Sequence, residues 1–598
     1  MRKTLIALSL TSALFAGCSQ TDEAQKETSS APVKQSLVSS QSNVNSTLAY
    51  IPADTVFFAG GLSTLDLQKL IKESPLLGGK DFNWAEVSKT QVESIQNDLQ
   101  DKLKETPALR VLTSLYIEYM GALSQPDTLL TTFGLGSAPS YAFYASGISP
   151  VLRLQLDDKS TFLSVLAKAE KNAGVTAVEE SRDGISIHRY PFENKTENDA
   201  DLIIALQDNF LVITIDIKAA PKSDLNMALG TEKPAQNLAN TTILKDLANR
   251  SNYDGRMMFY IDHQEIVKGL TTTDGNSLAK SLTLLDKDAQ DLSALRTPEC
   301  SADYQRIASN WPRTTSGYAP GSLEPGAKKI QGKLQVEIND AKLLSQLQSL
   351  QGSIPDFVKN YSTQSMLDVS MAINVSKVAS VVTSIWTEIG QTEYHCAELV
   401  KMQEEVKKQN PAMIGMGTAM VAGLKGVSAS ILSLDMDVVD DKPELKTIDA
   451  LFTISASDPA ALIASAAMFS PGLPTIPSDG TAIDFPLPMP LPAGVNIQPK
   501  IAIQGSHIVL FTGDESEKIA QSLANSALNT NGIFQFNMDY GQYMKIISKF
   551  TGLMQNTPGV SQSDINMINT LTQFDMKLSE GFNFNDQGFA LDIDIEMK

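Results

Sequence analysis

The feature that most constrains the fold of this chain is a series of strand-and-helix blocks that occurs twice in the same order. In the first block, a strand over residues 152–156 leads to Asp158 and then to a helix with apolar positions on one side. Its counterpart, a strand over residues 452–456, leads to Asp458 and Pro459 and then to a second helix. Asp at the N-cap and Pro at the first helical position are typical of helix starts, so both copies predict a strand followed by a capped helix.

A second pair of segments predicts two tight hairpins. Residues 204–213 and 501–510 each contain two apolar runs that are separated by a short turn. The turns are Asp208-Asn209 in the first copy and Gly505-Ser506 in the second, and such residues favour a two-residue hairpin connection.

A third pair predicts strands that end in a capping residue. Residues 255–262 and 532–539 both begin with Gly and end with Asp, at Asp262 and Asp539, and a helix pattern follows each of them. Three kinds of block in one order favour duplication over coincidence.

These blocks predict an α+β fold of two related modules, each an antiparallel sheet with helices packed on one face, produced by internal duplication. A stretch rich in Pro and Gly over residues 317–326 predicts the boundary, which gives modules over residues 48–320 and 321–598. Residues 589–597 alternate between apolar and acidic side chains, so we expect the acidic side of this strand to face water.

The N-terminus carries an export signal. Arg2 and Lys3 precede a short apolar run over residues 5–15, and the small residues Ala16 and Gly17 stand just before Cys18. A cationic start, a short apolar core and small residues before a cut predict a signal peptide over residues 1–17. The alternative is an ordinary signal or a short anchor, but the apolar core is too short for a stable membrane span.

This segment resembles the lipobox of Gram-negative bacterial lipoproteins, apart from Phe15, where that pattern usually has Leu, Val or Ile. The resemblance implies that Cys18 is lipidated with acyl chains such as palmitate, which anchor the mature N-terminus in a membrane. Ser19 follows the cysteine, and by the same resemblance it favours the outer membrane. Polar residues dominate from 18 to 47, which predicts a flexible tether with a mean reach of roughly 30 Å.

Composition limits the partners. Charged residues make up 19% and hydrophobic residues 42% of the chain, which is typical of a globular body. The formal net charge is -20, and removal of Arg2 and Lys3 with the signal peptide makes it -22. Such an acidic protein lacks the basic footprint that nucleic acid requires, so we expect the membrane, through the N-terminal lipid, and no nucleic acid among its partners.

The cysteines predict one disulfide. With Cys18 assigned to lipid, Cys300 and Cys396 remain, and two cysteines in an oxidising compartment favour a bond between them. The alternative is two separate buried thiols.

Enzyme signatures are missing from the sequence. The four histidines form no HExxH pattern, and no GxSxG, P-loop or GxGxxG motif occurs. Residues 277–280 spell SxxK, which is better read as part of an exposed helix. The sequence therefore predicts no catalytic residue, no metal site and no cofactor.

Two apolar stretches are candidates for binding a partner. Residues 485–492 alternate apolar residues with Pro, which forces an extended rod that could dock a partner or pack between modules. Residues 411–426 are rich in Met, Gly and Ala, and predict either a buried helix or an adaptable contact surface. The partner-binding candidates on the first stretch are Phe485, Leu487, Met489 and Leu491.

Residues 50–55 and the repeated blocks resemble those of uncharacterised proteobacterial envelope lipoproteins, a resemblance that implies export but no activity. We therefore expect a lipid-anchored, non-enzymatic envelope protein that binds a protein or an envelope polymer as a scaffold or adaptor. Two alternatives stay open. One is an envelope hydrolase that uses acids such as Asp262 and Asp539, and the other is a carrier of apolar ligands.

Overall fold

The structure is a computed structural model of the whole chain, and it describes most of the body. The expected signal peptide, Cys18 and nearly all of the expected tether lie outside the described residues. The described residues are 44–74, 84–85, 88–89, 92, 106–193, 199–286, 292–360, 365–409, 411–419, 421–439, 442–468, 474–486, 497–554, 565, 568, 572 and 574–598.

Over these residues the chain forms one sheet of nineteen strands. The strands are β1 (Phe57–Gly60), β2 (Tyr141–Ser146), β3 (Ser149–Gln155), β4 (Val178–Arg182), β5 (Ile185–Pro191), β6 (Ala200–Gln207), β7 (Phe210–Ile217), β8 (Met258–Asp262), β9 (Arg313–Tyr318), β10 (Lys329–Glu337), β11 (Leu367–Met371), β12 (Leu424–Val439), β13 (Lys442–Ala456), β14 (Ile483–Asp484), β15 (Lys500–Gln504), β16 (His507–Thr512), β17 (Phe534–Asp539), β18 (Met576–Asn585) and β19 (Gly588–Met597).

Every pairing between neighbouring strands is antiparallel, which makes the sheet continuous from one edge to the other. From edge to edge the strands follow the order β4-β5-β6-β7-β3-β2-β1-β8-β9-β10-β19-β18-β17-β11-β12-β13-β16-β15-β14. The prediction of a separate sheet in each module therefore differs from the structure, because β10 pairs with β19 along its whole length.

The described residues also form eighteen α-helices, and the mixed α+β class is confirmed. The helices are α2 (Leu67–Glu73), α5 (Pro107–Leu123), α6 (Leu129–Thr132), α7 (Lys159–Ala173), α8 (Lys222–Leu229), α9 (Ile243–Ser251), α10 (His263–Thr271), α11 (Ser277–Leu285), α12 (Pro298–Asn310), α13 (Ala341–Ser349), α14 (Asp356–Lys359), α15 (Val375–Gln391), α16 (Ala397–Lys408), α17 (Ala412–Ala419), α18 (Pro459–Ala467), α19 (Asp514–Ser522), α20 (Tyr540–Lys549) and α21 (Thr551–Met554).

The local signals in the sequence correspond to the observed elements. The side chain of Asp158 accepts from Ser160 N and Thr161 N at the start of α7, and Asp458 accepts from Ala461 N at the start of α18. The β6–β7 turn at Asp208 has φ 49°, and the β15–β16 turn at Gly505 has φ 57°. Left-handed φ values of this kind match the twist of tight hairpins, so both predicted hairpins are confirmed.

Helices cover both faces at the end of the sheet formed by β5, β6 and β7, whereas the sequence predicted helices on one face. Alternate residues of β6 divide between two cores. Ile203 and Ala205 pack with α8 and α9 on one face, and Ile204 packs with α5 and α7 on the other. Because successive strand residues point to opposite faces, the apolar run of β6 fills both cores.

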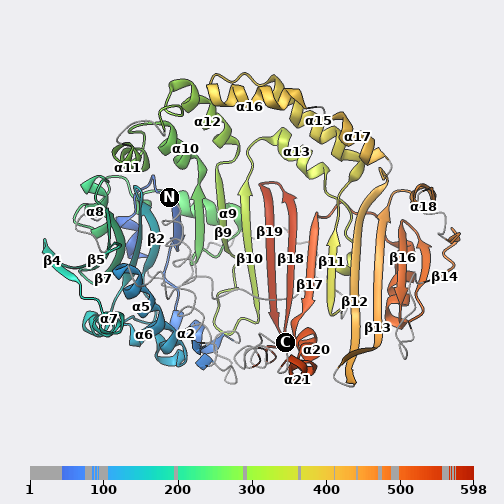
Figure 1. Cartoon of the computed structure of the whole chain (residues 1–598), viewed down its shortest axis with the longest axis horizontal. Helices are drawn as coiled ribbons and strands as arrows, with labels where there is room; N and C mark the ends of the chain where they lie inside the picture. The colour runs from blue at the N-terminus through green and yellow to red at the C-terminus, as the bar shows by residue number, and fades with distance from the viewer. Residues whose placement is uncertain are drawn as a thin grey trace.

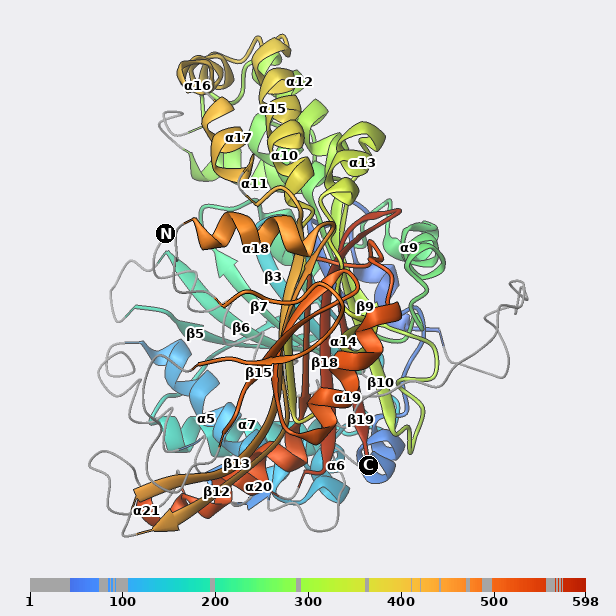
Figure 2. The same cartoon turned by 90° about the vertical axis from the view of Figure 1, so that its right-hand side faces the viewer.

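Figure 1 shows the sheet face-on, with α10, α12, α15, α16 and α17 along its upper edge and other helices at its ends. In Figure 2, turned by 90°, α9 and α14 lie to the right of the sheet, and α5 and α18 lie to the left. The expected boundary at residue 320 lies in the loop between the paired strands β9 and β10. Within the described part of the chain, no helix has the length and apolar character needed to span a membrane.

Candidate functional site

The centre of the sheet carries a continuous apolar row across many strands. Strand register places Phe259 of β8 opposite Ser316, then Leu334, Leu591, Phe582, Phe534, Met371, Val427 and Ile454 on successive strands as far as β13. Directly opposite residues lie on the same face of a sheet. A single face therefore presents aliphatic and aromatic side chains from β8 to β13.

Most of these side chains are half-buried, and two are exposed. We call this the apolar face. Its half-buried or exposed members are Phe57, Phe143, Phe259, Ile261, Ile330, Leu334, Val336, Leu367, Val369, Met371, Val427, Ile431, Phe452, Ile454, Phe534, Phe536, Phe582, Phe584, Phe589, Leu591 and Ile593. Met371 is 62% exposed and Phe452 is 41% exposed. A contiguous apolar surface of this kind is uncommon on soluble proteins and marks a binding site.

Aromatic contacts hold the middle of the apolar face in place. The rings of Phe534 and Phe582 lie 5.4 Å apart, and the ring of Phe589 lies 5.7 Å from that of Phe582. Among the described residues, no helix crosses the middle of the near side of β9, β10, β19, β18 and β17 (Figure 1). The helix α20 packs at one end of the face, where Leu578 and Ile595 are buried. The described helices therefore leave the middle of this side uncovered.

The opposite face of the same strands is polar and largely buried. Gln335, Asn537 and Asp368 are each 0% exposed. Asn537 Nδ2 donates to the Val358 carbonyl of α14 at 2.8 Å and to Asp368 Oδ2 at 3.2 Å. Burial raises the pKa of Asp368, while hydrogen bonds from Ser365, Ser430 and Asn537 act in the other direction. The usual arrangement, with apolar residues inside and polar residues outside, is reversed in the centre of this sheet.

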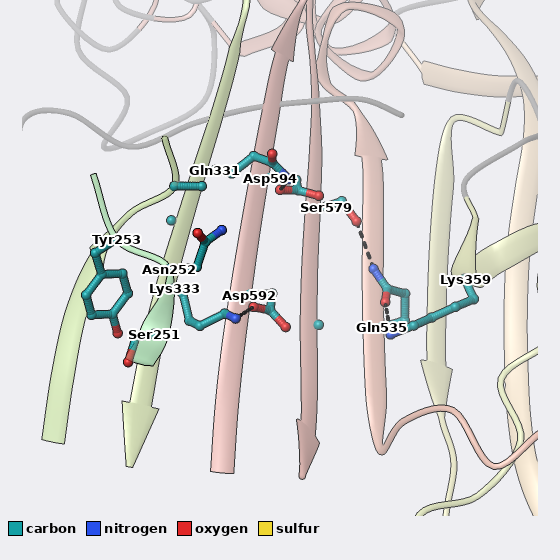
Figure 3. A pocket seen from close by; sticks show the side chains of 13 residues that line it. Ser251, Asn252, Tyr253, Gln331, Lys333, Lys359, Gln535, Ser579, Asp592 and Asp594 are labelled. Atoms are coloured by element: carbon teal, nitrogen blue, oxygen red, sulfur yellow. Dashed lines mark hydrogen bonds and ion pairs between the residues drawn. The ribbon is translucent and has the colours of Figure 1, made fainter. Parts of the chain in front are cut away.

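A polar cavity of about 400 Å³ lies on this buried face (Figure 3). Gln331 Nε2 donates to Asp594 Oδ1 at 2.8 Å, and Lys333 lies 3.7 Å from Asp592. From α14, Lys359 Nζ donates to Gln535 Oε1 at 3.3 Å. The cavity is lined by Ser251, Asn252, Tyr253, Ala319, Gln331, Gly332, Lys333, Lys359, Gln535, Ser579, Gly581, Asp592 and Asp594.

The groups in this cavity satisfy one another rather than form a reactive pair. Burial lowers the pKa of Lys359, and the charges of Asp592 and Asp594 oppose that shift. The lining contains no His or Cys that could act as a nucleophile or base. Within the described ranges, no group of three or more His, Cys, Asp or Glu side chains is arranged to hold a metal ion.

The two acids named for a hydrolase serve as helix caps. Asp262 accepts from Glu265 N at 3.0 Å and from Arg313 Nε at 2.8 Å. Asp539 accepts from Gln542 N at 2.9 Å and pairs with Lys598. Burial raises the pKa of Asp539, but the hydrogen bonds from Lys598 and Gln542 outweigh it and hold the pKa below its ordinary value. Both carboxylates are thus engaged in structure.

The predicted disulfide between Cys300 and Cys396 is present, and both cysteines are buried. It joins the first turn of α12 to the residue before α16, so it links the two predicted modules. Asp303 of α12 strengthens the junction, because its Oδ2 accepts from Cys396 N at 2.9 Å.

Of the Pro-rich stretch over residues 485–492, the structure describes only residues 485 and 486. Phe485 follows β14, is half-buried and donates its backbone N–H to the Pro499 carbonyl at 2.8 Å. Leu487, Met489 and Leu491 lie outside the described residues, as does Cys18. The partner-binding prediction for these residues therefore stays a prediction.

The sequence contained a signal for the apolar face. Phe582, Phe584, Phe589, Leu591 and Ile593 alternate with polar residues on two neighbouring strands. Such alternation predicts two unlike faces, but the usual inference that the apolar side is covered does not hold for these strands.

No protein-family model matches the chain, and no curated protein or solved structure matches it.

Proposed function

We propose that this protein is a lipid-anchored envelope protein, non-enzymatic, that binds the acyl chains of lipids on the apolar face of its sheet. The observation that carries this proposal is the row of half-buried apolar side chains from Phe259 through Leu591 and Phe534 to Ile454. Of the functions considered from the sequence, a carrier of apolar ligands fits this face best.

The chemistry of the apolar face favours acyl chains over a protein or an envelope polymer. Protein interfaces carry about one hydrogen bond per 100–200 Å², and polymers of sugars or peptides need polar partners as well. Between β9 and β17 the polar side chains on this face are Thr314, Ser316, Tyr318 and Glu580. An acyl chain needs no hydrogen bonds, and each methylene that it buries contributes about 0.8 kcal/mol.

The dimensions of the face also suit extended chains. Neighbouring strands lie about 4.8 Å apart, so the ten spacings from β2 to β13 correspond to roughly 48 Å across the sheet. Small-molecule pockets are compact and enclosed. An open strip of this length fits chains that lie across several strands.

The expected anchor supplies the lipid source. Lipidation at Cys18 and a tether of roughly 30 Å reach would keep the body beside the outer membrane, as proposed from the lipobox resemblance. A protein held there meets acyl chains at high local concentration, so even a modest affinity suffices for loading.

Duplication accounts for the width of the face, and we include it in the proposal. One half of the sheet follows the order β5-β6-β7-β3-β2-β1-β8-β9-β10, and the other follows β14-β15-β16-β13-β12-β11-β17-β18-β19. Counted inward from β5 and from β14, the second order repeats the first strand for strand, and the edge strand β4 has no counterpart. On this proposal the halves meet where β10 pairs with β19, and the boundary falls after β10 rather than at residue 320.

Photolabelling tests the proposal on the native lipidated protein in its membrane. A phospholipid with a diazirine group in its acyl chain is added, activated by light and mapped by mass spectrometry. We expect labelled peptides from β17, β18 and β19. The changes Phe534→Glu and Leu591→Glu should lower the label on these strands.

A matched control uses Val178 on β4, which is 64% exposed but lies outside the apolar face. Val178→Glu adds the same charge and should leave the label unchanged. Label restricted to the segment around Cys18, or label on these strands that Phe534→Glu and Leu591→Glu leave unchanged, would overturn the proposal.

A further inference from the structure

Exposed apolar side chains gather at one end of the molecule. Twelve large hydrophobic side chains of the described residues are exposed, and eight of them fall between residues 371 and 468. The eight are Met371 (62%), Ile373 (41%), Met402 (62%), Met413 (76%), Ile414 (39%), Val421 (38%), Phe452 (41%) and Met468 (72%). The segments that carry them build β11 to β13, α16, α17 and α18.

This end is also free of charge over long stretches. No Asp, Glu, Lys or Arg occurs in residues 411–424, 459–478 or 485–499. The chain as a whole has a formal charge of -20 and 19% charged residues. The two stretches that carry α17 and α18, residues 411–424 and 459–468, are therefore uncharged in an otherwise acidic protein. We call these two helices the uncharged end.

Its two helices are neighbours in space. The α17 segment leads into β12, and Gly423 O accepts from Ser457 N at 2.9 Å just before α18 begins. In Figure 2, α17 and α18 both project to the left of the sheet, which is the side of the apolar face. The most exposed members of that face, Met371 and Phe452, lie on the strands next to these helices.

We infer that the uncharged end docks on a lipid bilayer, with α17 and α18 lying in its interface. With eight and nine residues, these helices are too short to span a membrane, so we place them in the plane of the interface. A surface without charge enters neutral lipid without the desolvation cost of ionised groups. An acidic protein is repelled by anionic lipid headgroups, so docking through an uncharged surface avoids that repulsion.

The docking site also indicates how lipid reaches the proposed binding face. Exposed apolar side chains on α17, beside α18 and at Met371 and Phe452 are followed on the central strands by the half-buried members of the apolar face. Acyl chains would pass along this path between the bilayer and the apolar face. This second statement rests on the proposed function, whereas bilayer docking does not.

Quenching by brominated lipid tests the docking. The native lipidated protein is reconstituted in vesicles of zwitterionic phospholipid, with or without bromine on the acyl chains. An indole is introduced by Met413→Trp on α17 and, in a second protein, by Met468→Trp beside α18. We expect brominated lipid to reduce the emission of each added indole, with no dependence on salt.

Val178→Trp is the matched control, because Val178 is similarly exposed but lies on β4 at the other end of the sheet. This protein carries the same lipid tether, so quenching by mere proximity would affect it too, and we expect none. Equal quenching at residues 178, 413 and 468, or none at 413 and 468, overturns the inference. A change that depends on protein concentration and not on bromine would assign the uncharged end to a second copy of the chain and also overturn it.

The two proposals fail separately. Quenching at 413 and 468 without diazirine label on β17 to β19 would retain docking and reject acyl binding on the face. Label on those strands without quenching would retain acyl binding and reject docking at this end.

Discussion

The two ends of the sheet share a strand order but differ in what covers them. At the first end, the helix after β3 is α7, whose Phe162 and Leu166 are buried against β6 and β7. At the second end, the helix after β13 is α18, whose one fully buried residue is Pro459. The α7 sequence carries Lys and Glu on its outer side, whereas α18 has no charged residue.

This difference shows that one set of residues determines the strand order and another determines whether a helix packs on the sheet. The β6–β7 and β15–β16 hairpins need only alternating apolar runs and a turn, and both ends have them. A helix covers a sheet only when it presents a continuous apolar stripe to the strands and a polar side to water. α7 does so, whereas the small, uniformly apolar side chains of α18 make it suited to another apolar surface.

Removal of the disulfide should give the largest effect, because it uncouples the two ends. The bond closes a loop over a sequence separation of 96 residues, which stabilises the fold by about 4 to 5 kcal/mol in the chain-entropy model. We expect Cys300→Ser with Cys396→Ser to lower the free energy of unfolding by about that amount and to separate urea unfolding into two transitions. Circular dichroism and tryptophan fluorescence would follow them.

Reduction of the disulfide in the parent protein under denaturing conditions should give the same urea-unfolding curve as the double variant. Both keep Cys18, so the anchor is the same. If the double variant unfolds in a single transition with an unchanged urea midpoint, the pairing of β10 with β19 alone couples the two ends. The two ends would then unfold as one unit and could not be compared separately.

Matched truncations of leucines on α7 and α18 should give the next largest difference. Leu166 on α7 is 1% exposed, and Leu166→Ala should cost about 2 to 5 kcal/mol because it leaves a cavity in the core. Leu462 on α18 is half-buried, so Leu462→Ala should cost about 1 kcal/mol or less. The midpoint of urea unfolding in detergent measures both.

The variants Leu166→Ala and Leu462→Ala can also be compared in the presence of vesicles. If α18 lies in the bilayer interface, Leu462→Ala should weaken vesicle contact while leaving stability in detergent nearly unchanged. Equal loss of stability for the two variants would mean that α18 covers its end of the sheet as α7 does.

Much of the local structure could be predicted because it depends on neighbouring residues. The N-caps at Asp158 and Asp458 and the turn at Gly505 are signals within a few positions of the elements that they define. The pairing of Cys300 with Cys396 followed from the count of cysteines and the expected compartment.

The joining of the halves and the open face could not be predicted in the same way. The pairing of β10 with β19 brings Leu334 opposite Leu591, and no local signal specifies a partner so far along the chain. Alternation of Phe582 and Phe584 with polar residues defines two faces but not which of them a helix covers. The candidate site depends on which face of the strands the helices leave uncovered, and only the tertiary structure shows this.

The helix caps should give the smallest difference, and it depends on pH. Asp158 accepts from the hydroxyls of Ser160 and Thr161 and from their backbone N–H groups, and these bonds lower its pKa from 3.8 to about 2. Asp458 is followed by Pro459, Ala460 and Ala461, so it has no such hydroxyl partners.

Because the folded pKa of Asp158 lies below its unfolded value, the cap contributes stability that is complete above pH 3.8 and is lost as the pH falls towards 2. Asp158→Asn keeps a hydrogen-bond acceptor but has no charge to titrate, so its melting temperature should fall less than that of the parent between these pH values. Ser160→Ala should flatten the profile in part, because one of the hydroxyl donors is gone. If the melting temperatures of the parent and the Asp158→Asn variant change with pH in the same way, the charge of Asp158 does not stabilise α7. The N-caps of α7 and α18 would then not differ in their contribution to stability through charge.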